Sequence, residues 1–136
     1  MNQHTYLRAY LAGIAVPTVF LLVAMTVYCV LRYVYNFPVP IERVIVFPMA
    51  VVPNAWGLWN ILFIALRPRL QLSIGLHGAL LPILLAPLGI VVASLLNFPI
   101  ARIGVYVLVV APQALIVYYF AWKYLVGFLN RVQQIA

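Results

Sequence analysis

Matching sets of polar residues recur in the two halves of this chain. Each half carries an Asn-Phe-Pro turn, then an arginine, then a proline followed directly by an amide. The members are Asn36–Pro38, Arg43 and Pro53-Asn54 in the first half, and Asn97–Pro99, Arg102 and Pro112-Gln113 in the second. Arginine binds phosphate and carboxylate through charge-assisted hydrogen bonds. Polar groups duplicated at breaks in apolar segments are typical of membrane sites for a solute or a lipid headgroup.

Helical periodicity places these groups on corresponding faces. At about 100° per residue, Arg43 and Asn54 share one face of a helix, and Arg102, Tyr106 and Gln113 share the equivalent face of another. Polar residues within a membrane usually face the bundle interior or a cavity. We therefore predict a seam for a substrate or anion, with the arginines at its mouth. Two alternatives stay open: the amides repair backbone broken by prolines, or the arginines reach outward to headgroups.

His77 is the remaining candidate for this site. It follows Ser73 by about one helical turn and lies near the end of an apolar run. A proton relay is one interpretation, but the only carboxylate side chain, Glu42, lies outside the apolar runs. The competing interpretation is a hydrogen bond from the imidazole to a carbonyl that a proline leaves free.

The elements that must position these residues are membrane helices. The chain has 136 residues, of which 68% are hydrophobic and 7% charged, whereas soluble domains contain about 25% charged residues. Its long apolar runs are Tyr10–Tyr33, Val44–Leu66, Leu72–Leu96 and Ile103–Leu125. Each is long enough to cross a hydrocarbon core of about 30 Å as a helix. We predict an all-α membrane protein with four transmembrane helices in a single domain, residues 1–136.

The repeated polar sets predict how these helices are arranged. We expect two tandem-duplicated helical hairpins, at about residues 6–66 and 71–128, related by a parallel pseudo-two-fold axis because an even number of spans preserves orientation. Gly13 and Pro17 in the first hairpin correspond to Gly78 and Pro82 in the second. Prolines inside the apolar runs interrupt helical hydrogen bonds, so a Pro-kinked bundle is expected.

Basic residues predict the orientation. Arg8, Arg67, Arg69, Lys123 and Arg131 lie at one membrane face, and Arg32, Arg43 and Arg102 at the other. The positive-inside rule places both termini in the cytoplasm, in an inner or plasma membrane of bacterial type. The net charge of +7 suits the lipid bilayer and anionic phospholipid headgroups as partners. Nucleic acid is a poor partner, because no soluble basic surface is expected.

The shortage of reactive groups limits the function classes. One carboxylate, two histidines and one cysteine provide neither paired acids nor an ordinary metal site, so we expect no enzyme activity, cofactor or metal. Coupled transport usually needs an intramembrane carboxylate. The sequence therefore favours an uncoupled transport, channel or binding module, and the alternative is a non-catalytic accessory subunit of a larger membrane complex. Four helices are few for enclosing a pathway, so we expect a homo-oligomer or other membrane subunits.

Overall fold

All regular secondary structure in the described part of the chain is helical. The computed structural model describes residues 4–97 and 103–135, apart from the side chains at positions 43, 44, 103, 104 and 106, and these ranges contain no strand. The elements, in chain order, are α1 (Thr5–Tyr33), α2 (Ile41–Val44), the π-helical segment η1 (Ile45–Val51), α3 (Val52–Leu66), α4 (Ile74–Leu95), α5 (Ile103–Phe120), the π-helical segment η3 (Ala121–Val126) and α6 (Gly127–Val132).

Four helical stretches are long and apolar enough to cross a membrane, as predicted. They are Thr5–Tyr33, Ile45–Leu66, Ile74–Leu95 and Val107–Val132. The boundaries differ from the predicted ones mainly at the chain ends, where the first helix begins at Thr5 rather than Tyr10 and the last continues to Val132 rather than ending at Leu125. Helical hydrogen bonding continues through the polar ends of these segments, which a search for apolar residues does not recognise.

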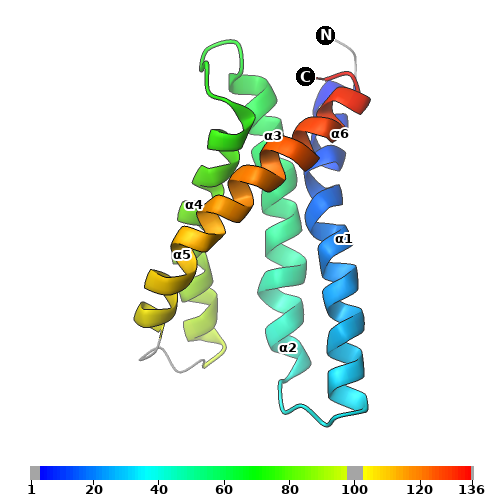
Figure 1. Ribbon diagram of the computed structural model, residues 1–136, viewed down its shortest axis with the longest axis vertical. Helices are drawn as coiled ribbons and strands as arrows, with labels where there is room; N and C mark the ends of the chain where they lie inside the picture. Colours follow the sequence, from blue (N-terminus) through cyan, green and yellow to red (C-terminus); the bar gives the residue numbers. More distant parts are fainter. Residues whose placement is uncertain (1–3, 98–102, 136) are drawn as a thin grey trace.

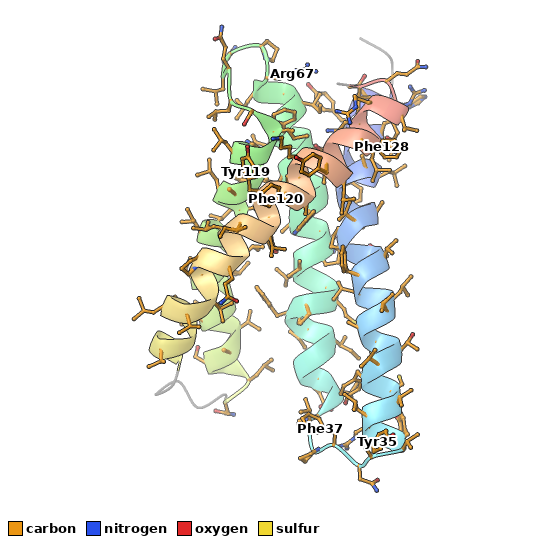
Figure 2. All side chains as sticks on the ribbon, viewed as in Figure 1. Tyr35, Phe37, Arg67, Tyr119, Phe120 and Phe128 are labelled. Carbon is orange, nitrogen blue, oxygen red and sulfur yellow. The ribbon has the colours of Figure 1, made fainter. Side chains whose placement is uncertain are left out.

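The last helix crosses the bundle obliquely (Figure 1). α1 packs along α3, and α4 packs against α5 and η3. The continuous run α5–η3–α6 then passes from α4 to α1, which contacts both η3 and α6. Both ends of the described chain lie at the same end of the bundle as the loop between α3 and α4 (Figure 1). Tyr35 and Phe37 lie at the opposite end from Arg67 (Figure 2).

Left-handed asparagines follow α1 and α4. Asn36 has φ 52° and Asn97 has φ 55°, a region that asparagine tolerates better than most residues. After α1, the Phe37 N–H donates to the Leu31 carbonyl at 3.0 Å, and the Arg32 guanidinium donates to the Phe37 carbonyl at 3.0 Å. The left-handed asparagine therefore stops the helix, and Arg32 fixes the turn that follows.

Gly13 and Gly78 are two of the glycines that lie at close helix contacts. A Cβ on Gly13 of α1 would lie 2.5 Å from the Trp56 carbonyl oxygen and 2.9 Å from the Gly57 Cα, both on α3. A Cβ on Gly78 of α4 would collide with the Trp122 ring. Glycine thus lets α1 approach the α3 backbone and gives Trp122 room against α4.

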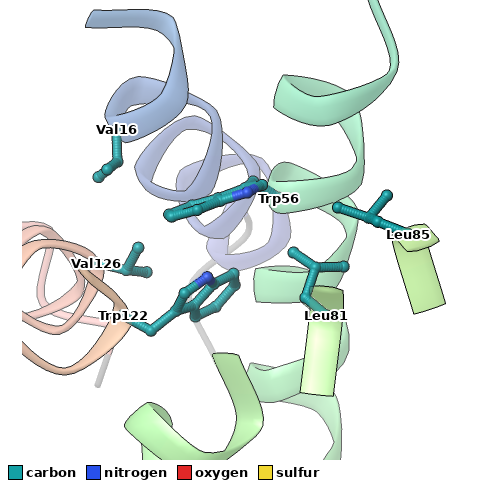
Figure 3. Close-up of a cluster of buried hydrophobic side chains, with 6 residues drawn as sticks. All are labelled: Val16, Trp56, Leu81, Leu85, Trp122 and Val126. Atoms are coloured by element: carbon teal, nitrogen blue, oxygen red, sulfur yellow. The ribbon is translucent and has the colours of Figure 1, made fainter. Parts of the chain in front are cut away.

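The hydrophobic core joins both halves of the chain. It consists of Val16, Trp56, Leu81, Leu85, Trp122 and Val126 (Figure 3). These side chains come from α1, α3, α4 and η3, and the rings of Trp56 and Trp122 lie 5.3 Å apart. Leu81 is about two turns from the start of α4, so the core occupies the part of the bundle nearer the two termini.

Candidate functional site

An open pocket lies between the helices of the two halves, and we call it the interhelical groove. Its volume is about 570 Å³, within the range of roughly 300–1,000 Å³ found for small-molecule sites. The lining residues come from η1, α3, α4 and α5, and they are Phe47, Val52, Pro82, Ile83, Leu85, Ala86, Gly89, Val107, Val110, Ala111, Ala114, Leu115 and Tyr118. Among them only Tyr118 carries a polar side-chain group.

Small residues on facing helices create this space. Ala86 and Gly89 lie about one turn apart on α4, and Ala111 and Ala114 lie about one turn apart on α5. Because these side chains are short, the two helices leave a gap that their neighbours do not fill. Phe47 lies opposite, with a ring carbon 3.4 Å from the place where a Cβ on Gly89 would stand.

The groove is closed at the end nearer the termini. Leu85 belongs both to the lining and to the hydrophobic core. Tyr118 also lines the groove, and its ring centroid lies 4.9 Å from that of Trp56 in the core. A molecule in the groove would therefore meet aromatic rings at its inner end.

In the sequence, two arginines precede the elements that line the groove. Arg43 is in α2, about one turn before the lining residue Phe47. Arg102 directly precedes α5, in which Val107 is the first lining residue. Arg102 lies outside the described residues, as do the side chains of Arg43 and Tyr106. Their role in binding an anion stays a prediction.

Asn54 forms hydrogen bonds within the first pair of helices. Its Oδ1 accepts a hydrogen bond from the Tyr10 hydroxyl of α1, and its Nδ2 donates to the Ala50 carbonyl at 2.7 Å. At about 100° per residue, Asn54 lies some 160° around α3 from the lining residue Val52. The Asn54 amide therefore joins α3 to α1 on the side away from the groove.

Gln113 lies on the exposed face of α5. Its direction is roughly 130° around the helix from the centre of the lining face, taking about 100° per residue. The structure describes no hydrogen bond that joins Gln113 to Asn54 or to any other described residue. The two amides share a sequence pattern, but the fold does not bring them together.

His77 is buried where α3 and α4 meet. Its ring stacks on Trp59 with centroids 4.8 Å apart, and Nε2 lies 3.0 Å from the Trp59 carbonyl. In return, Trp59 Nε1 donates to the His77 carbonyl at 2.8 Å. The imidazole thus bonds to a main-chain carbonyl. A proline did not free that carbonyl, because the residue four positions after Trp59 is Phe63. This reciprocal pair links the two halves.

Sequence reasoning missed a second buried polar pair. Asn60 and Asn130 are both 0% exposed and exchange amide hydrogen bonds of 2.8 and 3.0 Å. Asn60 Nδ2 also donates to the Ala9 carbonyl at 2.7 Å. The pair joins α1, α3 and α6. Asn60 lies within a predicted span and could have been noticed there. Asn130 lies beyond Leu125, the predicted end of the last span, so the sequence analysis did not consider it.

Comparisons with known proteins give no assignment. No family model, curated protein or solved structure matches this chain. Within the described ranges, no three His, Cys, Asp or Glu side chains come together where they could hold a metal ion. The chemistry of the groove and its surroundings is therefore the basis for a functional proposal.

Proposed function

We propose that this chain is a lipid-binding membrane protein, in which the interhelical groove holds an acyl chain and Arg43 and Arg102 hold a phosphate-bearing headgroup. The observation that carries the proposal is the composition of the groove, an open space between the two halves with a single polar side chain, Tyr118, in its lining.

The lining favours hydrocarbon over a polar solute. A polar molecule entering the groove would give up hydrogen bonds to water and could regain them only at Tyr118, and an unpaired polar group in an apolar site is unfavourable by several kcal/mol (roughly 2–7). An acyl chain loses no hydrogen bonds when it leaves the bilayer for this surface. The groove therefore suits the tail of a lipid better than an ion or sugar.

The arginines favour an anionic headgroup. Arg43 lies in the first turns of the α2–η1–α3 run, and Arg102 directly precedes α5. A cation at a helix N-terminus is disfavoured by the helix dipole, whereas a phosphate there is favoured by both the dipole and the arginine. Arg43 has an acidic neighbour in the sequence, Glu42, whereas Arg102 has none. A bound phosphate would therefore supply the counter-charge that Arg102 lacks in the sequence.

The closed inner end favours binding over conduction. Passage through the bundle would require Trp56 and Trp122 to separate, because their rings lie 5.3 Å apart in the core beyond the groove. We therefore propose that one copy of the chain binds lipid in this groove and does not form a permanent pore.

We retain the tandem duplication and its pseudo-two-fold relation as part of the proposal. Two local features support it, since Asn36 and Asn97 share a positive φ, and Gly13 and Gly78 each lie at a close helix contact. A duplicated hairpin would explain why the sequence carries an arginine before each of the two segments, η1–α3 and α5, that contribute to the groove.

Photolabelling tests the acyl-chain site. The protein is reconstituted in vesicles of phosphatidylglycerol carrying a photoactivatable acyl chain, and the labelled peptides are mapped. We expect labels on α4 and α5, and loss of most labelling in Ala114→Phe, whose ring would occupy the groove. Leu108→Phe is the matched control, because Leu108 lies on the same helix, is 78% exposed and does not line the groove. Equal labelling of all three proteins would overturn the acyl-chain site.

A competition measurement tests the headgroup. With a mixture of phosphatidylglycerol and phosphatidylcholine, we expect the unaltered protein to retain phosphatidylglycerol preferentially on native mass spectrometry. The Arg43→Ala and Arg102→Ala double variant should lose that preference while its groove is still photolabelled. An unchanged preference in the double variant would remove the arginines from the site.

A further inference from the structure

Gln113 presents an amide to the outside of the bundle within a membrane-spanning segment. It lies ten residues after the first residue of α5, or about 15 Å along the helix, whereas the hydrocarbon core is about 30 Å thick. It is exposed, and no hydrogen bond to it exists among the described residues. Hydrocarbon offers an amide no partner, so an exposed glutamine within the apolar stretch Val107–Val132 indicates a contact with another polar group.

The first half of the chain shows what Gln113 lacks. The corresponding amide, Asn54, accepts a hydrogen bond from Tyr10, which lies three residues before Gly13. The residue three positions before Gly78 is Gly75, which has no side chain to offer. The second half therefore cannot satisfy its amide as the first half does.

Gln113 lies within a stripe suited to helix pairing, which we call the α5 stripe: Val109, Gln113, Ile116 and Phe120. Successive members are separated by four, three and four residues, the spacing of a coiled-coil seam. All four are exposed, and Phe120 can be followed on α5 in Figure 2. At about 100° per residue, the stripe lies roughly opposite the face of α5 that lines the groove.

We propose that a second copy of this chain packs on the α5 stripe, with the Gln113 amides of the two copies exchanging hydrogen bonds across a two-fold axis along the membrane normal. An amide both donates and accepts, so it is complementary to its own copy across such an axis. The same exchange exists inside the chain between Asn60 and Asn130. This proposal goes beyond lipid binding, because the groove lies on the other side of α5 and stays open in the dimer.

The amide, rather than the apolar residues, must decide this association. Lipid tails are as apolar as valine or isoleucine, so burial of Val109 and Ile116 gives little net driving force within a bilayer. Hydrogen bonds between helices in membranes add a modest but measurable contribution. Removing the amide while preserving the apolar shape should therefore weaken the dimer without affecting the fold.

Cysteine cross-linking tests the surface. On a Cys29→Ser background, which removes the chain's only cysteine, Ile116→Cys should form a disulfide-linked dimer when membranes are oxidised. Leu108→Cys is the matched control, because it is exposed on the same helix about 140° away from Gln113, and it should stay monomeric. Cross-linking at both positions alike, or at Leu108 alone, would overturn the assignment. Recovery of Ile116→Cys linked to a foreign membrane protein would also overturn it, in favour of an accessory subunit.

The monomer–dimer equilibrium in bilayers tests the amide. By energy transfer between labelled copies, we expect Gln113→Leu to dissociate about 3- to 15-fold more readily than the unaltered chain, and Gln113→Asn to stay closer to it. Thermal unfolding should be unchanged in Gln113→Leu, because the side chain has no partner within the described chain. A monomeric unaltered protein at every protein-to-lipid ratio, or unchanged dimerisation of Gln113→Leu, would contradict the proposal. Photolabelling of the groove is measured on the same Gln113→Leu protein. If the groove is labelled but dimerisation is unchanged, the dimer proposal fails and lipid binding stands.

Discussion

Asn60 and Asn130 hold three helices together through one pair of amides. Both side chains are fully buried, and Asn60 also donates to the Ala9 carbonyl of α1. A buried amide without a partner is destabilising, whereas replacing both amides by apolar groups of similar shape can be almost neutral. At the scale of single residues, the stability of this bundle therefore depends on whether each buried polar group keeps its partner.

Replacing one asparagine of this pair by leucine should destabilise the protein more than the small difference in side-chain volume would. We expect Asn60→Leu and Asn130→Leu each to lower the free energy of unfolding by roughly 1–3 kcal/mol, because each leaves the other amide buried and unpaired. The double variant should be more stable than the sum of the two changes predicts. A double-mutant cycle in mixed micelles measures this coupling, and additivity within about 0.5 kcal/mol would contradict it.

The close approach of α1 to α3 depends on glycine. Gly13 meets main-chain atoms of Trp56 and Gly57, and backbone cannot move aside as the end of a flexible side chain can. Gly89 on α4 differs, because its nearest neighbour is a ring carbon of Phe47 at an ordinary contact distance. At the scale of helices, Gly13 sets how closely α1 and α3 approach, whereas Gly89 only borders the interhelical groove.

A matched pair of alanine substitutions should separate these two cases. We expect Gly13→Ala to lower the free energy of unfolding by about 1–3 kcal/mol, because its Cβ would overpack the α1–α3 contact. Gly89→Ala should be neutral or slightly stabilising, since alanine favours a helix by up to about 1 kcal/mol over glycine. Chemical unfolding of both variants measures the difference in the free energy of unfolding. Equal changes in the two variants would contradict overpacking at the α1–α3 contact.

The distribution of charge over the whole molecule predicts its orientation. Arg67 lies at one end of the bundle, as do both ends of the described chain, and Tyr35 lies at the other (Figure 2). The more basic end holds the loop between α3 and α4, and positive residues favour the cytoplasmic face. We therefore expect the groove to open toward the outer half of the membrane, the half to which the sequence assigns Arg43 and Arg102.

Labelling of single cysteines on the Cys29→Ser background checks this orientation. In intact cells, a membrane-impermeant maleimide should modify Tyr35→Cys and leave Gln71→Cys unmodified until the membrane is opened. Both residues are exposed loop positions, so accessibility within the protein does not bias the comparison. Modification of Gln71→Cys in intact cells would reverse the orientation and place the groove toward the cytoplasmic half.

The sequence by itself determined the helices and their number. An apolar run of about 20 residues in lipid must satisfy its backbone hydrogen bonds internally, and the helix is the structure that does so within one segment. The Asn-Phe-Pro segments likewise predicted the turn after α1, where Asn36 takes a left-handed conformation. Helical phase also grouped Gln113 with Tyr106 on one face of α5, but it could not say what that face meets.

Only the tertiary structure decided which faces pack together. It paired Asn60 with Asn130, which are 70 residues apart, joined His77 to Trp59, and left Gln113 facing outward. The physical reason is that lipid and protein interior are similarly apolar, so hydropathy cannot distinguish a buried helix face from an exposed one. That choice depends on close glycine contacts, aromatic packing and buried polar pairs, which arise only when distant segments of the chain meet.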